Sequence, residues 1–523
     1  IHYKFVDFYD IIINKINFNI DIDVFILILF ASVIVIKNMF FFYFEFWQIT
    51  FLRDFKVSLK NRLLKLHFQS DYEKVSRKSI STYIRDFNAT VERFIKSVQI
   101  SMQLLTEVLI FFGLIILLLF IQSSNVLTFA FTIAFIAFLF SMTLRKYLSR
   151  VGAKGLDLQQ KSLAKLIDMI NSTKEILAFG KYKVFTKQFK NYEIQQLNIS
   201  RVVSLIQKFP KFFFEILIAL SFTFFVLYTK SIGADLNAIL PQLGIIFIAV
   251  LRLLPSITKA LFYVQKLNVA ETASAQIADD INSYRYLEAN KKKQKINLDF
   301  NNSFLIKNIF FKYTTKDAYV LDNINLEVKK GDYIGIYGTS GGGKSTLINI
   351  VCGFLNPTKG EIFVDGRKID QLKESNWLEK IGLLTQENNL LDDTIINNIT
   401  LEFDNKKIDM EFLKKTIKQV GLSQLIHNSP NGYNSEIGPN GIALSGGERQ
   451  RIGIARAFYA RKEILVFDES TSNLDEMNKK KFIETINDLS AISTIIMISH
   501  DKDVIKNCKK RYQIKDHKLI RSF

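Results

Sequence analysis

Cysteine and histidine are scarce in this sequence, and their scarcity excludes several kinds of site. Only Cys352 and Cys508 occur in 523 residues, so the sequence contains no disulfide framework. Four of the five histidines, His2, His67, His427 and His517, stand outside any catalytic or metal-binding pattern. The sequence therefore offers no metal cluster, no Ser–His–Asp triad and no dinucleotide-binding fingerprint.

Acidic residues are also too few to balance the basic ones. The sequence has 50 Asp and Glu residues and 69 Lys and Arg residues, which gives a net charge of +19. Such an excess can indicate nucleic-acid binding, but here the basic residues lie between apolar segments, which is typical of cytosolic loops in membrane proteins. We therefore expect no nucleic-acid partner. No signal peptide is visible and the first residue is Ile1, so we expect the sequence to be a fragment.

Long apolar runs are abundant before about residue 265. The chain is 48% hydrophobic with 47 Phe, and its mean hydropathy is +0.13. A helix needs about 20 mostly apolar residues to cross a membrane. The run from Leu109 to Ile121 is apolar on every face, as a lipid-exposed helix must be, whereas a buried core helix needs no such pattern. We predict five spans, at residues 24–47, 102–121, 126–142, 212–228 and 239–254.

The charge of the loops predicts the orientation of these spans. Residues 53–96 and 145–208 are long and basic, while 122–125 and 230–237 are short and nearly neutral. Basic loops stay in the cytosol, so the short turns face outward and residues 1–23 lie outside. The segment after the last span is then cytosolic.

A phosphate-binding loop follows in that cytosolic segment. The residues from Gly338 to Ser345 match G-x-x-x-x-G-K-[ST], between a predicted buried strand at 333–337 and a helix at 345–351. Glycines leave backbone N–H groups free to surround a triphosphate, and the helix N-terminus favours anions. We expect nucleotide contacts from Gly338, Thr339, Ser340, Gly341, Gly342, Gly343, Lys344, Ser345 and Thr346, with the hydroxyl of Ser345 also binding Mg²⁺.

A pair of carboxylates follows a second buried strand. The apolar run 464–467 ends in Asp468 and Glu469, at the strand edge where open α/β sheets bind ligands. Asp468 is placed to hold Mg²⁺, and Glu469 is placed to polarise an attacking water. Another apolar strand, at 494–499, ends at His500.

Together with Leu444-Ser445-Gly446-Gly447-Glu448-Arg449-Gln450, these motifs resemble an ATP-binding cassette over roughly 220 residues from Phe304 onward. The resemblance implies catalytic roles for Glu469, His500 and Gln386, with Gln386 also sensing Mg²⁺. It implies that Tyr313 stacks on adenine and that Ser445, Gly446 and Gly447 cap the ATP of the opposite subunit. It also implies that Asp475 is the D-loop acid of the nucleotide site. Each of Tyr313, Gln386 and His500 taken alone would be read as an ordinary structural residue.

Three positions depart from the cassette pattern without removing a catalytic group. Glu448 stands where exporters more often have Gln, Asn473 where Ala is common, and Asp501 where Arg is common. We therefore expect a hydrolytically competent site that uses ATP and Mg²⁺.

The order of the two parts resembles an exporter half-transporter. The resemblance implies an α-helical polytopic membrane domain over residues 1–285, followed by an α/β P-loop ATP-binding cassette domain over residues 286–523. It also implies a homodimer in the bacterial inner membrane, with cytoplasmic cassettes. An even number of spans is expected, so one N-terminal helix is missing. Segments near 70–74 and 173–177 would be the coupling helices that press on the cassettes.

Three basic residues in or beside the spans bear on the cargo. Lys37, Lys211 and Arg252 would suit an anionic substrate, although Lys211 and Arg252 could also reach the cytosolic interface with their charged ends. The segments 249–256 and 209–212 resemble bacterial lipid-linked oligosaccharide flippases, which implies a polyprenyl-pyrophosphate oligosaccharide as substrate and contact with membrane lipid. Export of lipid A, a drug or a peptide stays open. A soluble ATPase acting on nucleic acid or ribosomes, or an ATP-gated channel, fits less well.

Overall fold

The chain folds into two compact units. The computed structural model describes residues 22–120, 124–231, 236–291, 296–314, 318–386, 388–438, 441–469, 476–490 and 493–522. The first unit, here called the helical unit, comprises Ile1–Ser70 and Arg77–Ala289. The second, the sheet unit, comprises Asn290–Phe523 together with the short segment Asp71–Ser76.

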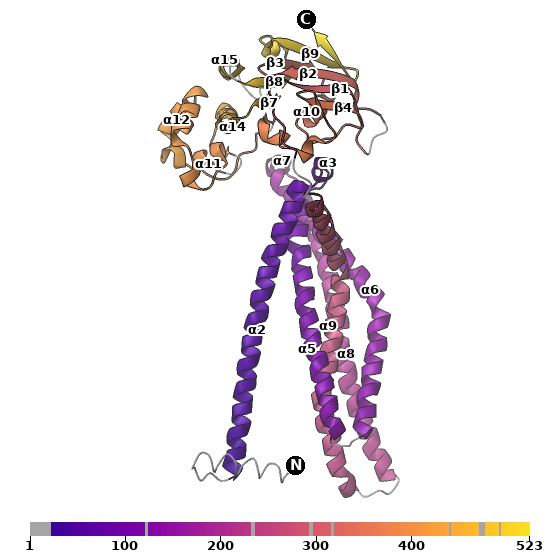
Figure 1. Cartoon of the computed structure of the whole chain (residues 1–523). Helices are drawn as coiled ribbons and strands as arrows, with labels where there is room; N and C mark the ends of the chain where they lie inside the picture. Colours follow the sequence, from indigo (N-terminus) through magenta and orange to yellow (C-terminus); the bar gives the residue numbers. More distant parts are fainter. Residues whose placement is uncertain are drawn as a thin grey trace. The chain divides into compact units, whose positions relative to one another are not determined.

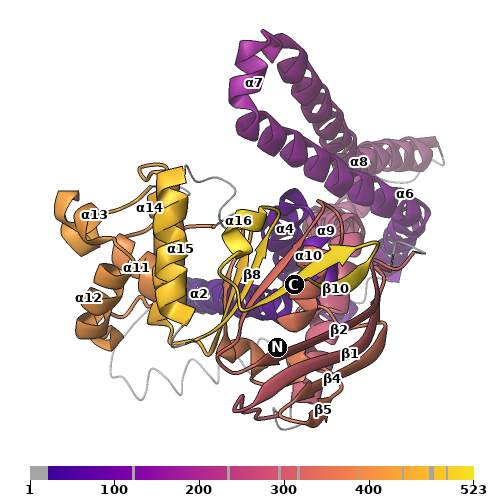
Figure 2. The same cartoon turned by 90° about the horizontal axis from the view of Figure 1, so that it is seen from above.

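Five long helices form most of the described helical unit (Figure 1). They are α2 (Ile22–Gln69), α5 (Val91–Phe120), α6 (Ser124–Asn171), α8 (Tyr182–Ser231) and α9 (Leu236–Lys291). The short helix α4 (Ile80–Arg85) and a π-helix, η1 (Asp86–Thr90), lead into α5. Another short helix, α7 (Thr173–Ala178), lies at the tip of the arm that α6 and α8 form (Figure 2).

The apolar faces of α2 and α5 are largely uncovered within the chain. Among the described residues, Asp23–Gln69 and Ile80–Ile116 are helical stretches long and apolar enough to cross a membrane. Side chains such as Leu27, Phe30 and Phe42 are exposed. Apolar side chains on all faces of a helix need an apolar surrounding, as a bilayer provides. The limits of the five spans stay predictions, since many side chains of 126–142 and 239–254 lie outside the described part.

The helices of this unit pack through two apolar clusters. The C-terminal half of α2 packs against α5 and α9, while its N-terminal half stands apart from them in Figure 1. A second cluster joins α8 to α9, with Phe111 of α5 at its edge. The buried members of these clusters are Leu52, Leu59, Leu63, Val91, Ile95 and Ile277 in the first, and Phe214, Ile257 and Leu261 in the second.

Two sheets form the framework of the sheet unit. One has the strand order β10 (Lys518–Ser522), β9 (Lys510–Lys515), β3 (Tyr333–Gly338), β8 (Thr494–Ser499), β7 (Ile464–Asp468) and β6 (Ile381–Leu384). Its strands are parallel except for β10. The other is antiparallel, in the order β2 (Leu321–Lys329), β1 (Ser303–Phe311), β4 (Lys359–Val364) and β5 (Arg367–Ile369). A helical domain followed by an α/β P-loop domain confirms the predicted fold class.

One buried core spans both sheets and the helix α10 (Lys344–Val351). Trp377 is fully buried in it, and its ring stacks on Phe304 of β1 at a centroid distance of 4.8 Å. The indole N–H of Trp377 donates to the carbonyl of Val351 at 2.8 Å. This core fixes α10 against the strand before it, because buried aromatic rings contribute large apolar areas.

Smaller helices lie on one side of the sheets in Figure 2. They include α11 (Ile395–Thr400), α12 (Met410–Gln419), α13 (Ser423–Asn428), α14 (Gly446–Tyr459) and α15 (Glu476–Ser490). A short helix, α16 (Lys502–Ile505), packs on β3 and β8.

The short helix α3 (Tyr72–Ser76) belongs to the sheet unit although long helices flank it in the chain. Lys373 donates to Asp71 at 3.0 Å, and the hydroxyl of Thr314 donates to Glu73 at 2.7 Å. The ring of Tyr72 lies 5.3 Å from that of Phe354. The segment predicted as the first coupling helix therefore contacts cassette residues directly.

Candidate functional site: a nucleotide-binding loop

Glycines shape the loop between β3 and α10. Gly341 and Gly343 have φ angles of +78° and +102°, which side chains rarely adopt. A Cβ at Gly338 would lie 2.5 Å from the carbonyl oxygen of Ile514, and one at Gly343 would lie 2.9 Å from that of Val320. The loop therefore needs glycine both for its turns and for its close approach to the neighbouring backbone.

Lys344, the first residue of α10, lies buried beside this loop, with 4% of the residue exposed. Its Nζ donates to the carbonyls of Gly338 and Thr339, at 3.0 Å each. The same Nζ lies 3.3 Å from Oε1 of Glu469. The loop and the end of β7 therefore meet through one lysine.

Asp468 ends β7 beside this lysine and offers an unsatisfied oxygen. Its Oδ1 is buried without a hydrogen-bond partner, while the hydroxyl of Ser345 is a partner of its carboxylate. Burial raises the pKa of Asp468 and the charge of Glu469 adds to the rise, against the Ser345 hydrogen bond and the charge of Lys344. Buried carboxylate and hydroxyl oxygens with spare lone pairs fit Mg²⁺, which prefers oxygen ligands.

Glu469 holds an unusual backbone conformation. Its φ is +49°, in the left-handed region that non-glycine residues seldom occupy. Its backbone N–H donates to the carbonyl of Ile498 at 3.0 Å, which ties it to β8. Strain of this kind persists where the surroundings impose it, and it is concentrated at functional sites.

His500 stands at the same edge of the sheet. Strands β7 and β8 are parallel, with Asp468 opposite Ile498, so His500 follows just beyond this pair. Its side chain is exposed. The strand order thus brings His500 near Glu469, although 30 residues separate them in the sequence. Part of this intervening segment lies outside the described residues.

Two further predicted residues follow the strands β1 and β6. The hydroxyl of Tyr313 lies 3.1 Å from that of Thr346, and the Tyr313 ring meets Phe311 edge-on at 5.0 Å. Tyr313 is therefore brought to the first turn of α10. Gln386 is exposed just after β6, the strand that pairs with β7.

Ser445, by contrast, begins a helix elsewhere in the unit. It is the N-cap of α14, and its side chain and backbone N–H exchange hydrogen bonds with Glu448 in a capping box. The cassette variant Glu448 thus stabilises this helix start, in the way that acidic residues at N3 do. Helix α14, which also carries Gly446 and Gly447, packs on α11, α12 and β6, whereas α10 packs on β3 and β7.

The remaining predicted residues are less fully described. Asp475 lies outside the described residues, and so does the side chain of Arg252. Lys37 is exposed on α2, and Lys211 on α8 lies 3.9 Å from Glu215, one turn away. Lys211 is therefore partly neutralised by a carboxylate that the sequence analysis overlooked.

A second overlooked carboxylate lies inside a predicted span. Glu107 of α5 is largely buried, with 11% of its side chain exposed, and lies 3.1 Å from Lys259 of α9. A single Glu within an otherwise apolar run was the signal in the sequence, since such residues are costly in membranes unless paired. Its partner could not be read from the sequence, because Lys259 lies on another helix.

Comparisons with known proteins identify the kind of domain that the sheet unit contains. Residues 321–472 match the family model described as ABC transporter, and this stretch runs from β2 through the loop, α14 and β7. The sheet unit is an ABC transporter ATPase domain. Among curated relatives, the alpha-hemolysin translocation ATP-binding protein HlyB of Escherichia coli O157:H7 is 40% identical over 205 residues, which are 39% of this chain and 29% of the relative.

Other relatives carry different names. ABC transporter B family member 29, chloroplastic, of Arabidopsis thaliana is 35% identical over 211 residues, 40% of this chain and 33% of that protein. The leukotoxin translocation ATP-binding protein LktB of a Pasteurella haemolytica-like species is 39% identical over 205 residues, 39% of this chain and 28% of that protein. Each alignment thus spans about a third or less of the curated relative.

One solved structure resembles nearly the whole chain. A bacterial Atm1-family ABC exporter with ATP bound superposes with a TM-score of 0.74, covering 94% of this chain and 85% of that one at 20% identity. At this identity the likeness concerns the fold alone. The helical unit followed by one ATPase domain therefore has the fold of that exporter.

Proposed function

We propose that two copies of this chain form an ATP-driven exporter in a bacterial inner membrane, with the ATPase domains in the cytoplasm. The observation that carries the proposal is the meeting of Lys344 and Glu469, 3.3 Å apart, where the phosphate-binding loop reaches the end of β7. The apolar helices of the other unit supply the membrane part.

The side chains at this edge divide the work of ATP hydrolysis. The loop N–H groups and Lys344 bind the phosphates, and Tyr313 stacks on the base. Ser345, Asp468 and Gln386 would hold Mg²⁺, which when bound neutralises charge on the phosphate oxygens. Glu469 orients the attacking water and accepts its proton, while His500 contacts the phosphate that leaves.

Two copies are needed because the signature residues lie away from the loop of their own chain. Ser445 begins α14, which packs on α11, α12 and β6. In a head-to-tail pair, Ser445, Gly446, Gly447 and Asp475 of one chain complete the ATP site of the other. Closure and reopening of the pair would then switch the membrane helices between two states.

Mixing two inactive variants tests this arrangement. Lys344→Ala should weaken nucleotide binding, and Ser445→Arg should allow binding but block closure. In a verified mixed dimer, one site escapes both changes, so hydrolysis should recover to a substantial fraction of wild type. Recovery that stays at the level of the parent variants would contradict the head-to-tail pair. Exposed Glu484→Gln on α15, mixed with wild type, is the control for the mixing procedure.

For the cargo we propose a lipid-linked anionic molecule of the polyprenyl-pyrophosphate oligosaccharide class. The support is the positive charge of Lys37 and Arg252 within predicted spans, with Lys211 partly balanced by Glu215. Positive charge in hydrocarbon is costly and is eased by a phosphate partner. The names of the hemolysin and leukotoxin relatives favour a second candidate, a secreted polypeptide.

Vesicle assays separate the two cargoes. Replacing Lys37, Lys211 and Arg252 by Gln together should lower translocation of a polyprenyl-pyrophosphate glycan several-fold, and basal hydrolysis should fall less. Lys154→Gln, exposed on α6 outside the predicted spans, is the matched control. A triple variant that folds normally and still transports the glycan at the wild-type rate would rule out a role for these basic residues in attracting the cargo. Stimulation of hydrolysis by a polypeptide alone would favour the second candidate.

A further inference from the structure

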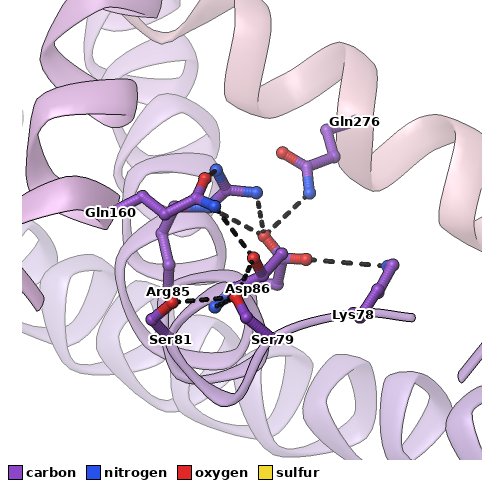
Figure 3. A network of polar contacts seen from close by, with 8 residues as sticks. Lys78, Ser79, Ser81, Arg85, Asp86, Gln160 and Gln276 are labelled. Carbon is purple, nitrogen blue, oxygen red and sulfur yellow. Dashed lines mark hydrogen bonds and ion pairs between the residues drawn. The ribbon is translucent and has the colours of Figure 1, made fainter. Parts of the chain in front are cut away.

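A buried carboxylate joins two segments of the helical unit. Asp86 is the first residue of η1, and its side chain is 11% exposed. Its Oδ1 accepts hydrogen bonds from Nη2 of Arg85 at 2.7 Å and from Nε2 of Gln276 on α9 at 2.9 Å (Figure 3). Lys78 lies 3.8 Å from its other oxygen. The carboxylate therefore links the segment before α5 to α9.

Arg85 extends this network to α6. Its Nη1 donates to the side-chain oxygen of Gln160, and the amide of Gln160 donates back to Thr82 of α4 at 2.9 Å. Figure 3 shows Gln160 and Gln276 approaching the Arg85–Asp86 pair from two different helices. We call this set of Lys78, Thr82, Arg85, Asp86, Gln160 and Gln276 the Asp86 network.

Helices α6 and α9 are also in close contact near this network. A Cβ at Gly152 of α6 would lie 2.2 Å from the carbonyl oxygen of Val269 on α9, so the two backbones touch there. Gln160 and Gln276 follow about two turns farther along their helices. The Asp86 network therefore fastens the segment α4–η1 to a pair of helices that are already held together.

The position of the network along the chain gives it a mechanical meaning. Helix α3 belongs to the ATPase domain, and the chain returns to the helical unit at Arg77, just before Lys78. Helix α9 leads back into the ATPase domain after Ala289. The network thus connects two places where the chain passes between the units. One is the segment that enters the helical unit at Arg77, and the other is helix α9, which leaves that unit after Ala289.

The local helix geometry also sets this segment apart. Residues Asp86–Thr90 form a π-helix between two α-helices. Such wide turns are rare and occur frequently at functional sites. Here Asp86 reaches α9 while Asn88, in the same turn, accepts from Lys60 of α2 at 3.2 Å.

We propose that Asp86 is a positioning residue for coupling: it makes α6 and α9 follow the movement of α3 when the ATPase domain binds and hydrolyses ATP. The proposal rests on the proposed function as an ATP-driven exporter. A charged hydrogen-bond centre suits this task, since charge-assisted hydrogen bonds are roughly twice as strong as neutral ones and are specific in direction. Burial raises the pKa of Asp280 on α9; the charge of Lys78 opposes this rise, and the negative charge of Asp86 adds to it.

The test compares hydrolysis with movement of α6. A cysteine replaces the half-exposed Tyr147 on α6, and its rate of labelling by a maleimide is measured with and without ATP and vanadate. Cys352 and Cys508 are buried, so they react slowly. In Asp86→Asn, hydrolysis should stay within about threefold of wild type while the nucleotide-dependent change in labelling falls by at least that factor. Asp86→Glu should restore part of the change.

Gln276→Met serves as a second variant that removes one hydrogen bond without burying a charge. It should lower the labelling change less than Asp86→Asn does. Asp157→Asn, whose carboxylate forms an exposed ion pair with Lys161 on α6, should leave both readings unchanged.

Three results would overturn the proposal. The first is a wild-type labelling change in both Asp86→Asn and Gln276→Met. The second is an equal loss of hydrolysis and labelling that Asp86→Glu does not relieve, which would indicate a folding role. The third is labelling of the wild-type background that nucleotide does not alter, because Asp86 would then have no movement to transmit. Failure of the wild-type protein to hydrolyse ATP would instead contradict the proposed function.

Discussion

The two units place their polar groups in opposite ways. The ATPase domain has two short contiguous groups of polar residues, Gly338 to Ser345 and Asp468 to Glu469. The two groups meet at the carboxyl edge of one sheet. In the helical unit, polar contacts join single residues on distant helices, as Asp86 and Gln276 do across 190 positions. Chemistry carried by loops leaves a motif, whereas chemistry carried by helix packing leaves isolated residues.

The difference follows from how each unit is held together. Strands β3, β7 and β8 fix the backbone, so short loops at their ends can present several functional groups at once. Long apolar helices present one side chain per turn to each neighbour, so a polar site needs contributions from several helices. Three predictions test this comparison, from the largest expected effect to the smallest.

Glu469→Gln should lower ATP hydrolysis by about 10²–10⁴-fold, since a positioned base contributes that much and the amide cannot accept the proton. Nucleotide binding should persist, because Lys344 and Asp468 are unchanged, and the dimer should accumulate with ATP bound. Phosphate release from reconstituted protein gives the rate. Glu484→Gln, exposed on α15, should match wild type. A variant that keeps more than about a tenth of the turnover would contradict the role of Glu469.

Lys259→Ala should destabilise the helical unit by about 1–3 kcal/mol, because it leaves the buried carboxylate of Glu107 without its ion-pair partner. Glu107→Gln should cost less, since Lys259 is 58% exposed and can be solvated. Lys161→Ala breaks an exposed pair and should cost between about 0 and 1 kcal/mol. Unfolding in detergent ranks the three variants. Equal costs for Lys259→Ala and Lys161→Ala would mean that the buried pair contributes no more than a surface pair.

Asp468→Asn should stabilise the ATPase domain while abolishing hydrolysis. The raised pKa of Asp468 means that the folded state favours the protonated carboxyl. Its ionised form therefore costs stability above that pKa, and stability increases as the pH falls through it. Removing the charge should raise the melting temperature at neutral pH, by about 2–4 °C per kcal/mol for a domain of this size.

Bound magnesium and nucleotide should make wild type more stable than Asp468→Asn. Wild type gains stability from the bound ligands by mass action, and Asp468→Asn should gain less because it lacks a metal ligand. Thermal unfolding at neutral pH with and without Mg²⁺ and ATP measures both effects. Asp488→Asn, exposed on α15, should change neither value. A melting temperature for Asp468→Asn below that of wild type in the absence of ligands would refute the electrostatic argument.

Much of the ATPase domain could be predicted from sequence. The strand before Gly338, the helix after it and the strand that ends at Asp468 were all placed by local apolar patterns. The resemblance alone implies that Tyr313 stacks on adenine, because nothing local to Tyr313 distinguishes it from another strand aromatic. Its contact with Thr346 appears only in the structure. The buried carboxylate Glu107 could have been noticed, but its pairing with Lys259 could not.

The sequence by itself predicted the succession of apolar helices and a cassette, and it supplied the residues that we propose to bind a triphosphate. Both depend on neighbours within a few positions, namely the glycines around Lys344 and the unbroken apolar runs. Only the tertiary structure decided that Lys344 contacts Glu469, that α3 joins the ATPase domain, and that Asp86 reaches α9. These contacts depend on the packing of whole strands and helices, because chain folding brings together groups whose separation in sequence carries no local signal.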